Sequence, residues 1–279
     1  MTGITSTDAE NPSDVRRSSV AERPRHVAWL LVAGVALAAL NLRTAITSVG
    51  PVLDEIIVDL GMSGVVAGLL TTLPVLCFAV FGVSTPALSR RFGEHRVLVA
   101  ALLALTLGLG TRVLAGDPWL FLVLSALALS GGAIGNVLLP ALIKQHFPHR
   151  VGMMTTVYTT ALAVGTTMAA AATVPVQQAS GSWPLALAIY AVFGVIAVLP
   201  WLLVLGYNPP RTDSSHVFGL LQVLRTGAGR QSVLFFGSQS AVAYIMFGWF
   251  ARCCGTTAWT RPPPESRCPT SPSWPSRSR

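Results

Sequence analysis

Two arginines, Arg43 and Arg112, lie inside long apolar stretches of this 279-residue chain. A charge in such a stretch is costly and is by default a functional candidate. Polar residues surround Arg43 at helical spacing: Asn41, Thr44, Thr47 and Ser48. A guanidinium presents a rigid fork of donors that suits a carboxylate or another small planar anion. The spacing favours an anion site in a water-filled cavity, with Arg43, Asn41 and Thr47 as binding residues. Bonding of Arg43 to carbonyls of a neighbouring helix is the structural alternative.

Arg112 lies about three residues from the end of its apolar stretch, so its long side chain is expected to reach the outer interface. This position favours a structural role. Asp, Glu, Lys and His do not occur deep in any apolar stretch. Proton-coupled carriers usually relay protons through such residues, so the sequence predicts no proton relay within these stretches.

Weaker candidates for substrate contact lie in later apolar stretches: Asn136, Tyr158, Gln239 and Tyr244. Each side chain offers hydrogen bonds, and each could equally join two helices. The sequence alone leaves both roles open for these four residues.

The cysteines predict neither a metal site nor a catalytic site. Cys77 lies in an apolar stretch, where a buried cysteine is the default interpretation. The other three, Cys253, Cys254 and Cys268, fit no zinc pattern with partner histidines. No nucleophile–base pair stands out either. We therefore expect no metal, no cofactor and no enzymatic activity.

Seven apolar stretches must position these side chains. They lie near residues 27–50, 62–85, 97–115, 119–143, 152–176, 184–205 and 232–251. Each is close to the roughly 20 residues with which a helix crosses the hydrocarbon core. Lipid requires each span to satisfy its own backbone hydrogen bonds, so the stretches are predicted to be helices.

The connecting loops alternate in charge. On one side they are acidic or uncharged, as at residues 54–59, 117 and 177–183, whereas the loops at 90–96 and 144–150 are basic. Short loops rich in Lys and Arg stay in the cytoplasm. This alternation predicts a multi-pass protein of the plasma (inner) membrane with a cytoplasmic N-terminus.

Composition agrees with a membrane protein. Hydrophobic residues make up 52% and charged residues 11% of the chain, whereas soluble domains carry about 25% charged residues. The net charge of +8 is spread over loops and the tail rather than gathered in one stripe. This spread argues against nucleic-acid binding and makes the lipid bilayer the expected partner.

The sequence divides into five segments. Residues 1–25 are polar and predict a disordered cytoplasmic N-terminus. A six-helix transmembrane bundle follows over 26–206. Residues 207–231 read as a cytoplasmic loop between bundles with a short amphipathic helix at 217–225. The seventh transmembrane helix is expected at 232–251.

Residues 252–279 form the fifth segment, rich in proline, arginine and serine and predicted to be disordered. The seventh span runs outward, so this basic tail would emerge outside, against the positive-inside rule. The conflict favours loss of the original reading frame, or truncation, near residue 252. An ordinary disordered tail is the alternative.

Pairs of glycines four residues apart predict close helix packing. One pair is Gly64 and Gly68 in the second span, and the other is Gly131 and Gly135 in the fourth. The spacing does not say which helices meet there.

Residues 27–250 resemble the N-terminal bundle and seventh helix of a major facilitator superfamily transporter. More narrowly, they resemble the cyanate permease (cyanate porter) family, which includes nitroimidazole-type transporters. The resemblance rests on ALNLRTAITSVGP at 39–51, GLLTTLPV at 68–75, GNVLLPALIK at 135–144 and YTTAL at 158–162. It implies an all-α membrane fold of two six-helix halves with a substrate site between them near the midplane. This chain would supply the first half and one further helix, with the C-terminal half missing.

The superfamily's motif between its second and third helices is partly present. Arg91 and Gly93 match it, whereas Pro86 and Arg90 stand where the family has glycine and aspartate. The resemblance thus implies a conformational loop at Arg90, Arg91 and Gly93 without its usual aspartate.

Three functions compete. The first is a secondary transporter that moves a small anion such as cyanate, or a similar small organic solute, by alternating access. The second is a drug or metabolite exporter of the same superfamily. The third is a membrane remnant or interaction protein that does not transport. Self-association, or a separate C-terminal half, is an expected partner.

Overall fold

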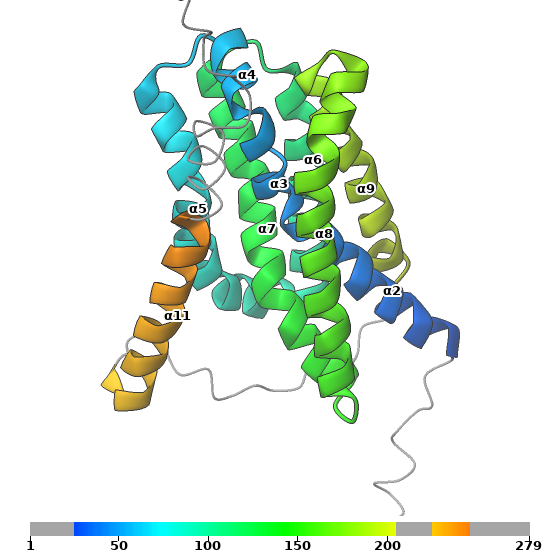
Figure 1. Ribbon diagram of the computed structural model, residues 1–279. Coiled ribbons are helices and arrows are strands. Elements are labelled where there is room, and N and C mark those ends of the chain that lie inside the picture. The colour runs from blue at the N-terminus through cyan, green and yellow to red at the C-terminus, as the bar shows by residue number, and fades with distance from the viewer. Residues whose placement is uncertain (1–24, 205–224, 246–279) are drawn as a thin grey trace, which may run out of the picture. The chain divides into compact units, whose positions relative to one another are not determined.

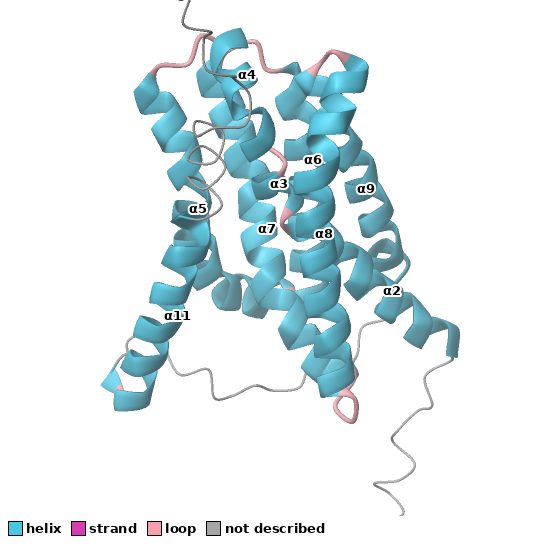
Figure 2. Ribbon diagram, in the orientation of Figure 1, coloured by secondary structure: helices cyan, strands magenta, loops and turns pink. Residues whose placement is uncertain are grey.

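Helices account for all the regular structure in the described part of the chain. The computed structural model describes residues 25–204 and 225–245, which contain helices and no strands (Figures 1 and 2). Six stretches of the described residues are long and apolar enough to cross a membrane. Residues 1–24 of the predicted N-terminal segment, residues 217–224 of the predicted amphipathic helix and the tail lie outside the described residues.

The first span is interrupted, contrary to the single helix predicted at 27–50. It comprises α2 (Arg25–Leu42), α3 (Thr44–Thr47), a 3-10 turn (Gly50–Val52) and α4 (Leu53–Asp59) (Figure 1). Hydroxyl side chains at 44, 47 and 48 compete with the backbone for hydrogen bonds, and Pro51 has no N–H to continue the ladder. Residues 53–59, expected as an acidic loop, are helical. Asp54 and Glu55 occupy the first turn of α4, where the helix dipole favours carboxylates.

Five further long helices follow in order. They are α5 (Gly64–Phe92), α6 (Glu94–Thr111), α7 (Pro118–His146), α8 (Val151–Ser180) and α9 (Trp183–Val204). Asp117 caps α7, since its Oδ2 accepts from the backbone N–H groups of Trp119 at 2.9 Å and Leu120 at 3.1 Å. Gly181 ends α8 in the left-handed conformation with φ +66°.

The helix α11 (Gly227–Ile245) belongs to a second compact unit of the chain and is described by itself. It begins five residues earlier than the predicted start at 232, so the end of the predicted loop is helical. The last residues of the predicted span, 246–251, lie outside the described residues.

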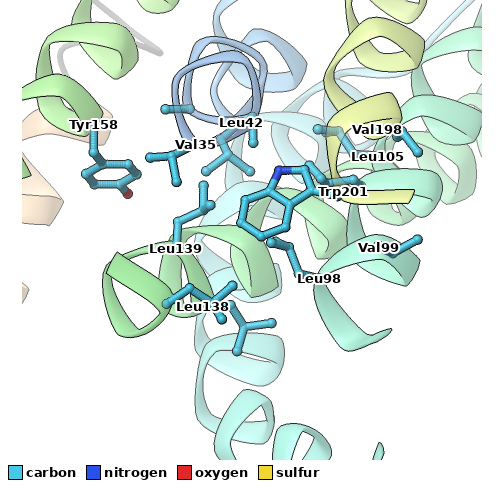
Figure 3. Close-up of a cluster of buried hydrophobic side chains, with 14 of the residues drawn as sticks. Val35, Leu42, Leu98, Val99, Leu105, Leu138, Leu139, Tyr158, Val198 and Trp201 are labelled. Atoms are coloured by element: carbon cyan, nitrogen blue, oxygen red, sulfur yellow. The ribbon is translucent and has the colours of Figure 1, made fainter. Parts of the chain in front are cut away.

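The core of the bundle joins α2 to its neighbours. Trp201 of α9 is buried among apolar side chains that include Leu42 of α2 and Leu98 of α6 (Figure 3). Its indole Nε1 donates to the carbonyl of Gly34 at 3.1 Å. This hydrogen bond fixes α9 against α2 and satisfies a buried donor.

Of the two predicted glycine pairs, one is confirmed. A Cβ on Gly131 would collide with the carbonyl oxygen of Ala101 and lie 2.7 Å from the Leu105 nitrogen, so α6 and α7 pack backbone to backbone. A Cβ on Gly135 would meet the Leu42 side chain at 2.5 Å. The prediction is wrong for Gly64 and Gly68 among the described residues, because a Cβ at either position meets no atom within 4 Å.

This difference makes a testable prediction. We expect Gly131→Ala to lower the unfolding temperature of the chain in detergent micelles. Overpacking costs about 1–3 kcal/mol, against the roughly 1 kcal/mol that alanine gains over glycine within a helix. Gly68→Ala is the matched control and should keep or raise that temperature. Equal unfolding temperatures for the two variants would contradict the close α6–α7 contact.

Candidate functional site

Arg43 lies at the interruption of the first span, close to the middle of the 31-residue stretch Trp29–Asp59. Its carbonyl oxygen accepts from the Thr47 nitrogen at 3.0 Å and from the Thr47 hydroxyl at 3.0 Å. The Arg43 side chain is partly exposed, whereas the neighbouring residues Leu42 and Thr44 are buried. The interruption thus places a partly exposed cation at the middle of the span.

Two further predicted site residues, Tyr158 and Asn136, are joined to each other near this interruption. The Tyr158 hydroxyl of α8 donates to Asn136 Oδ1 of α7 at 3.0 Å, and Arg43 lies close enough to Tyr158 to interact with it electrostatically. Asn136 is oriented by its own helix, because its Nδ2 donates to the Gly132 carbonyl at 3.1 Å. Tyr158 is only 8% exposed, so its hydroxyl is held by the protein rather than by bulk water.

The glycines of α7 explain why Asn136 reaches the level of Arg43. A Cβ on Gly132 would lie 3.0 Å from the carbonyl oxygen of Leu42, and Gly135 faces the Leu42 side chain. Without side chains at these two positions, α7 approaches the end of α2 directly before Arg43. Figure 3 shows Leu42, Leu139 and Tyr158, from three helices, around this part of the core.

Asn41 and Thr47 are buried within the bundle, whereas the sequence predicted that they line a water-filled cavity. Asn41 is 2% exposed, and its Nδ2 would lie 2.9 Å from a Cβ on Gly194, so this amide is directed toward α9. Its Oδ1 lies 2.8 Å from the Thr44 hydroxyl, which can donate to it. Thr47 is also buried and bonds to the Arg43 carbonyl. Both residues shape the interruption from inside the bundle.

The Arg112 side chain is buried inside the bundle, contrary to the expectation that it reaches the outer interface. It is 0% exposed, in a 3-10 turn (Arg112–Leu114) that follows α6. Its Nη1 donates to the Ala45 carbonyl at 3.1 Å and its Nη2 to the Ser48 hydroxyl oxygen at 3.0 Å. Sequence reasoning missed this link, because nothing in the spacing pairs residue 112 with residues 45 and 48.

The segment expected as a conformational loop is mostly helical. Arg90 and Arg91 lie in the last turn of α5, where the helix dipole favours cations, and the Arg91 guanidinium carbon lies 5.4 Å from the Phe92 ring centroid. Gly93 alone separates α5 from α6, with φ +90° and ψ 143°. Only glycine adopts this conformation without strain. The backbone therefore explains why a glycine stands at position 93. The role of this segment in conformational change stays a prediction.

The two remaining predicted residues belong to the second unit. Gln239 is exposed on α11. Tyr244 lies in the same helix, and its side chain is outside the described residues. Among the residues that the structure describes, no group of three or more His, Cys, Asp or Glu side chains could hold a metal ion.

Comparison with known proteins agrees with this architecture. The chain is 37% identical over 226 residues to an uncharacterized transporter, YycB, of Bacillus subtilis, covering 80% of this chain and 55% of YycB. It is 34% identical over 223 residues to the 2-nitroimidazole transporter of Escherichia coli, covering 79% and 56%. It is 34% identical over 167 residues to the cyanate transport protein CynX of Escherichia coli, covering 59% and 43%. The chain thus spans about half the length of these relatives.

A solved structure shows the same fold. The crystal structure of tetrameric PepTSo2 superposes with a TM-score of 0.51 at 18% identity, covering 80% of this chain and 50% of that one. The family model described as Major Facilitator Superfamily matches residues 33–260. This multi-pass membrane protein belongs to the Major Facilitator Superfamily.

Proposed function

We propose that this bundle forms one wall of the substrate site of a secondary transporter, and that the substrate is a small anion such as cyanate. The observation that carries the proposal is the partly exposed Arg43 at mid-span, beside the hydrogen-bonded pair Tyr158 and Asn136. In the described part of the chain no carboxylate forms an ion pair with Arg43. Its charge is therefore available to a substrate anion.

Each of the three side chains has a distinct task in this proposal. The Arg43 guanidinium binds the anion through parallel N–H groups, and the low dielectric of the bundle strengthens the attraction. The Tyr158 hydroxyl proton is engaged with Asn136 Oδ1, so the Tyr158 oxygen is left as an acceptor that can orient the guanidinium. Asn136 Nδ2 has a second N–H beyond the one bonded to Gly132, and this N–H can reach the anion.

A second candidate substrate is a small planar solute that carries a nitro group. One relative is named a 2-nitroimidazole transporter, and a nitro group presents two oxygens to a guanidinium as a planar anion does. The Tyr158 ring supplies an aromatic face next to Arg43. In this candidate the ring stacks on Tyr158 while Arg43 binds the nitro oxygens.

Transport by alternating access is proposed to need a second bundle. Only 28% of the apolar window of the α5 span and 22% of that of the α8 span are buried, whereas at least 44% is buried in each of the other four spans. Their exposed threonines, such as Thr72 and Thr159, bond to carbonyls of their own helices. These two faces are suited to a protein partner across the substrate site. A separate C-terminal half or a second copy could supply it.

The anion site is tested by Arg43 variants of the purified chain in detergent micelles. Ligand binding should raise the unfolding temperature of the unchanged chain in nitrate or cyanate, with chloride holding the ionic strength constant. We expect Arg43→Lys to raise the half-saturating anion concentration about tenfold, because a point charge replaces a fork of charge-assisted hydrogen bonds. Arg43→Gln should abolish the stabilisation.

Arg96→Gln is the control, since it removes an exposed arginine at the start of α6. It should leave the half-saturating concentration unchanged. The same titration with 2-nitroimidazole separates the two substrate classes. Stabilisation of Arg43→Gln by the same anion concentration as the unchanged chain would refute the proposed role of Arg43.

The proposed orientation, with a cytoplasmic N-terminus in the plasma membrane, is tested by cysteine labelling in intact cells. The four native cysteines are first replaced by serine, and single cysteines are then placed at exposed positions. A membrane-impermeant maleimide should label Val58→Cys and Gly116→Cys but not His149→Cys. All three should react after permeabilisation. Labelling of His149→Cys in intact cells would reverse the orientation.

The need for a second bundle is tested in liposomes. The purified chain, reconstituted at low density as a monomer, should show no saturable uptake of labelled cyanate. One wall alone cannot switch the substrate site between inward-open and outward-open states. Saturable uptake that scales linearly with chain density would show that the bundle transports by itself.

A further inference from the structure

Arg112 is a fully buried cation that the proposed substrate site does not use. In the described part of the chain no carboxylate pairs with it, and its two hydrogen bonds both end on the first span, at Ala45 O and Ser48 Oγ. Burying a charge is expensive unless hydrogen bonds compensate for it.

Both acceptors lie at the end of α3, where the first span is interrupted. This helix has four residues, so its last carbonyls have no partners within the helix. Arg112 Nη1 satisfies the Ala45 carbonyl, and an arginine is well suited to the C-terminal end of a helix. The interruption is thus closed by a side chain from a different span, 67 residues further along the chain.

The hydrogen bonds continue from Ser48 back past Arg43. Ser48 Oγ accepts from Arg112 at 3.0 Å and donates to the Thr44 carbonyl at 2.5 Å. The Thr44 hydroxyl in turn lies 2.7 Å from the Asn41 carbonyl oxygen. These hydrogen bonds fix the backbone on both sides of Arg43 and lie on buried residues, whereas Arg43 itself is partly exposed and interacts electrostatically with Tyr158.

The end of α6 before Arg112 is closely packed. Four residues before it, a Cβ on Gly108 would lie 2.5 Å from the Ala128 backbone nitrogen, so this end of α6 is packed directly on α7. A small ligand does not fit beside Arg112. Arg112 is fully buried, and its Nε is enclosed by protein without a hydrogen-bond partner. The guanidinium therefore acts on the protein.

We infer that Arg112 is a positioning residue: it holds the interrupted middle of the first span and so keeps Arg43 directed at Tyr158 and Asn136. The inference rests on the proposed anion site for its functional consequence, but the structural link between Arg112 and α3 stands on the two hydrogen bonds alone. The test is accordingly divided into two measurements that can fail separately.

The first measurement is amide hydrogen exchange of the purified full chain in detergent micelles. In Arg112→Gln, peptides covering residues 44–52 should exchange about tenfold faster than in the unchanged chain, because a hydrogen bond from a charged group is lost at the interruption. Leu109→Ala is the control. It removes a fully buried side chain one turn earlier in α6 and leaves the two hydrogen bonds in place.

Ser48→Ala is a milder second variant, should Arg112→Gln fail to fold. It deletes one acceptor of Arg112 and should accelerate amide exchange in the same peptides. Arg112→Lys keeps a cationic donor, so its exchange rate there should lie between those of Arg112→Gln and the unchanged chain. Unchanged exchange at 44–52 in Ser48→Ala, or acceleration spread evenly over the bundle as in Leu109→Ala, would overturn the inference.

The second measurement is the nitrate-dependent rise in unfolding temperature. Arg112→Gln and Ser48→Ala should raise the half-saturating nitrate concentration about tenfold while keeping the full rise at saturation. Arg43→Gln should abolish the rise. Faster exchange at 44–52 with unchanged nitrate affinity would make Arg112 merely structural and overturn its positioning role. If the unchanged chain shows no nitrate effect at all, the proposed function fails, and the exchange result still decides the link to α3.

Discussion

An interrupted helix inside a membrane exposes backbone carbonyls and amides that lipid cannot satisfy, and the first span of this protein is interrupted at its middle. The rest of the bundle is built around that constraint. Arg112 satisfies the end of α3 from the third span. Thr44, Thr47 and Ser48 bond to nearby backbone carbonyls on either side of Arg43. The interruption is kept because the protein supplies the hydrogen bonds that lipid would not.

Close helix approach is the second requirement of this arrangement. Gly131 and Gly108 bring α6 and α7 together, and Gly132 and Gly135 bring α7 to the end of α2. The same contacts bring Arg112 to Ala45 and Ser48 of the first span, and bring the part of α7 that carries Asn136 to Leu42. A chain with side chains at these glycines could not place both groups beside the interruption, since the backbones would be held apart.

The two least buried spans complete the functional picture. The walls of a transport site are polar enough to bind a substrate yet must leave one face uncovered for the opposing wall. In the proposed transport site, α5 and α8 supply these uncovered faces, because they are the least buried of the six spans, and Tyr158 lies on α8. Arg112 bonds to the first span at Ala45 and Ser48, just after Arg43, whereas Arg43 interacts electrostatically with Tyr158 of α8.

The sequence by itself determined the membrane fold and indicated Arg43 as a candidate binding residue. Hydrophobic runs, loop charges and a cation within a span are local properties, and their effect in a bilayer does not depend on how the helices pack. It also indicated Asn136 and Tyr158 as polar groups, though not that they bond to each other. Only the tertiary structure decided that Arg112 turns inward to Ala45 and Ser48, that Asn41 faces α9, and that Gly64 and Gly68 pack on nothing among the described residues. These facts depend on which helix faces meet, and that pairing follows from contacts between residues far apart in the chain, which no local spacing encodes.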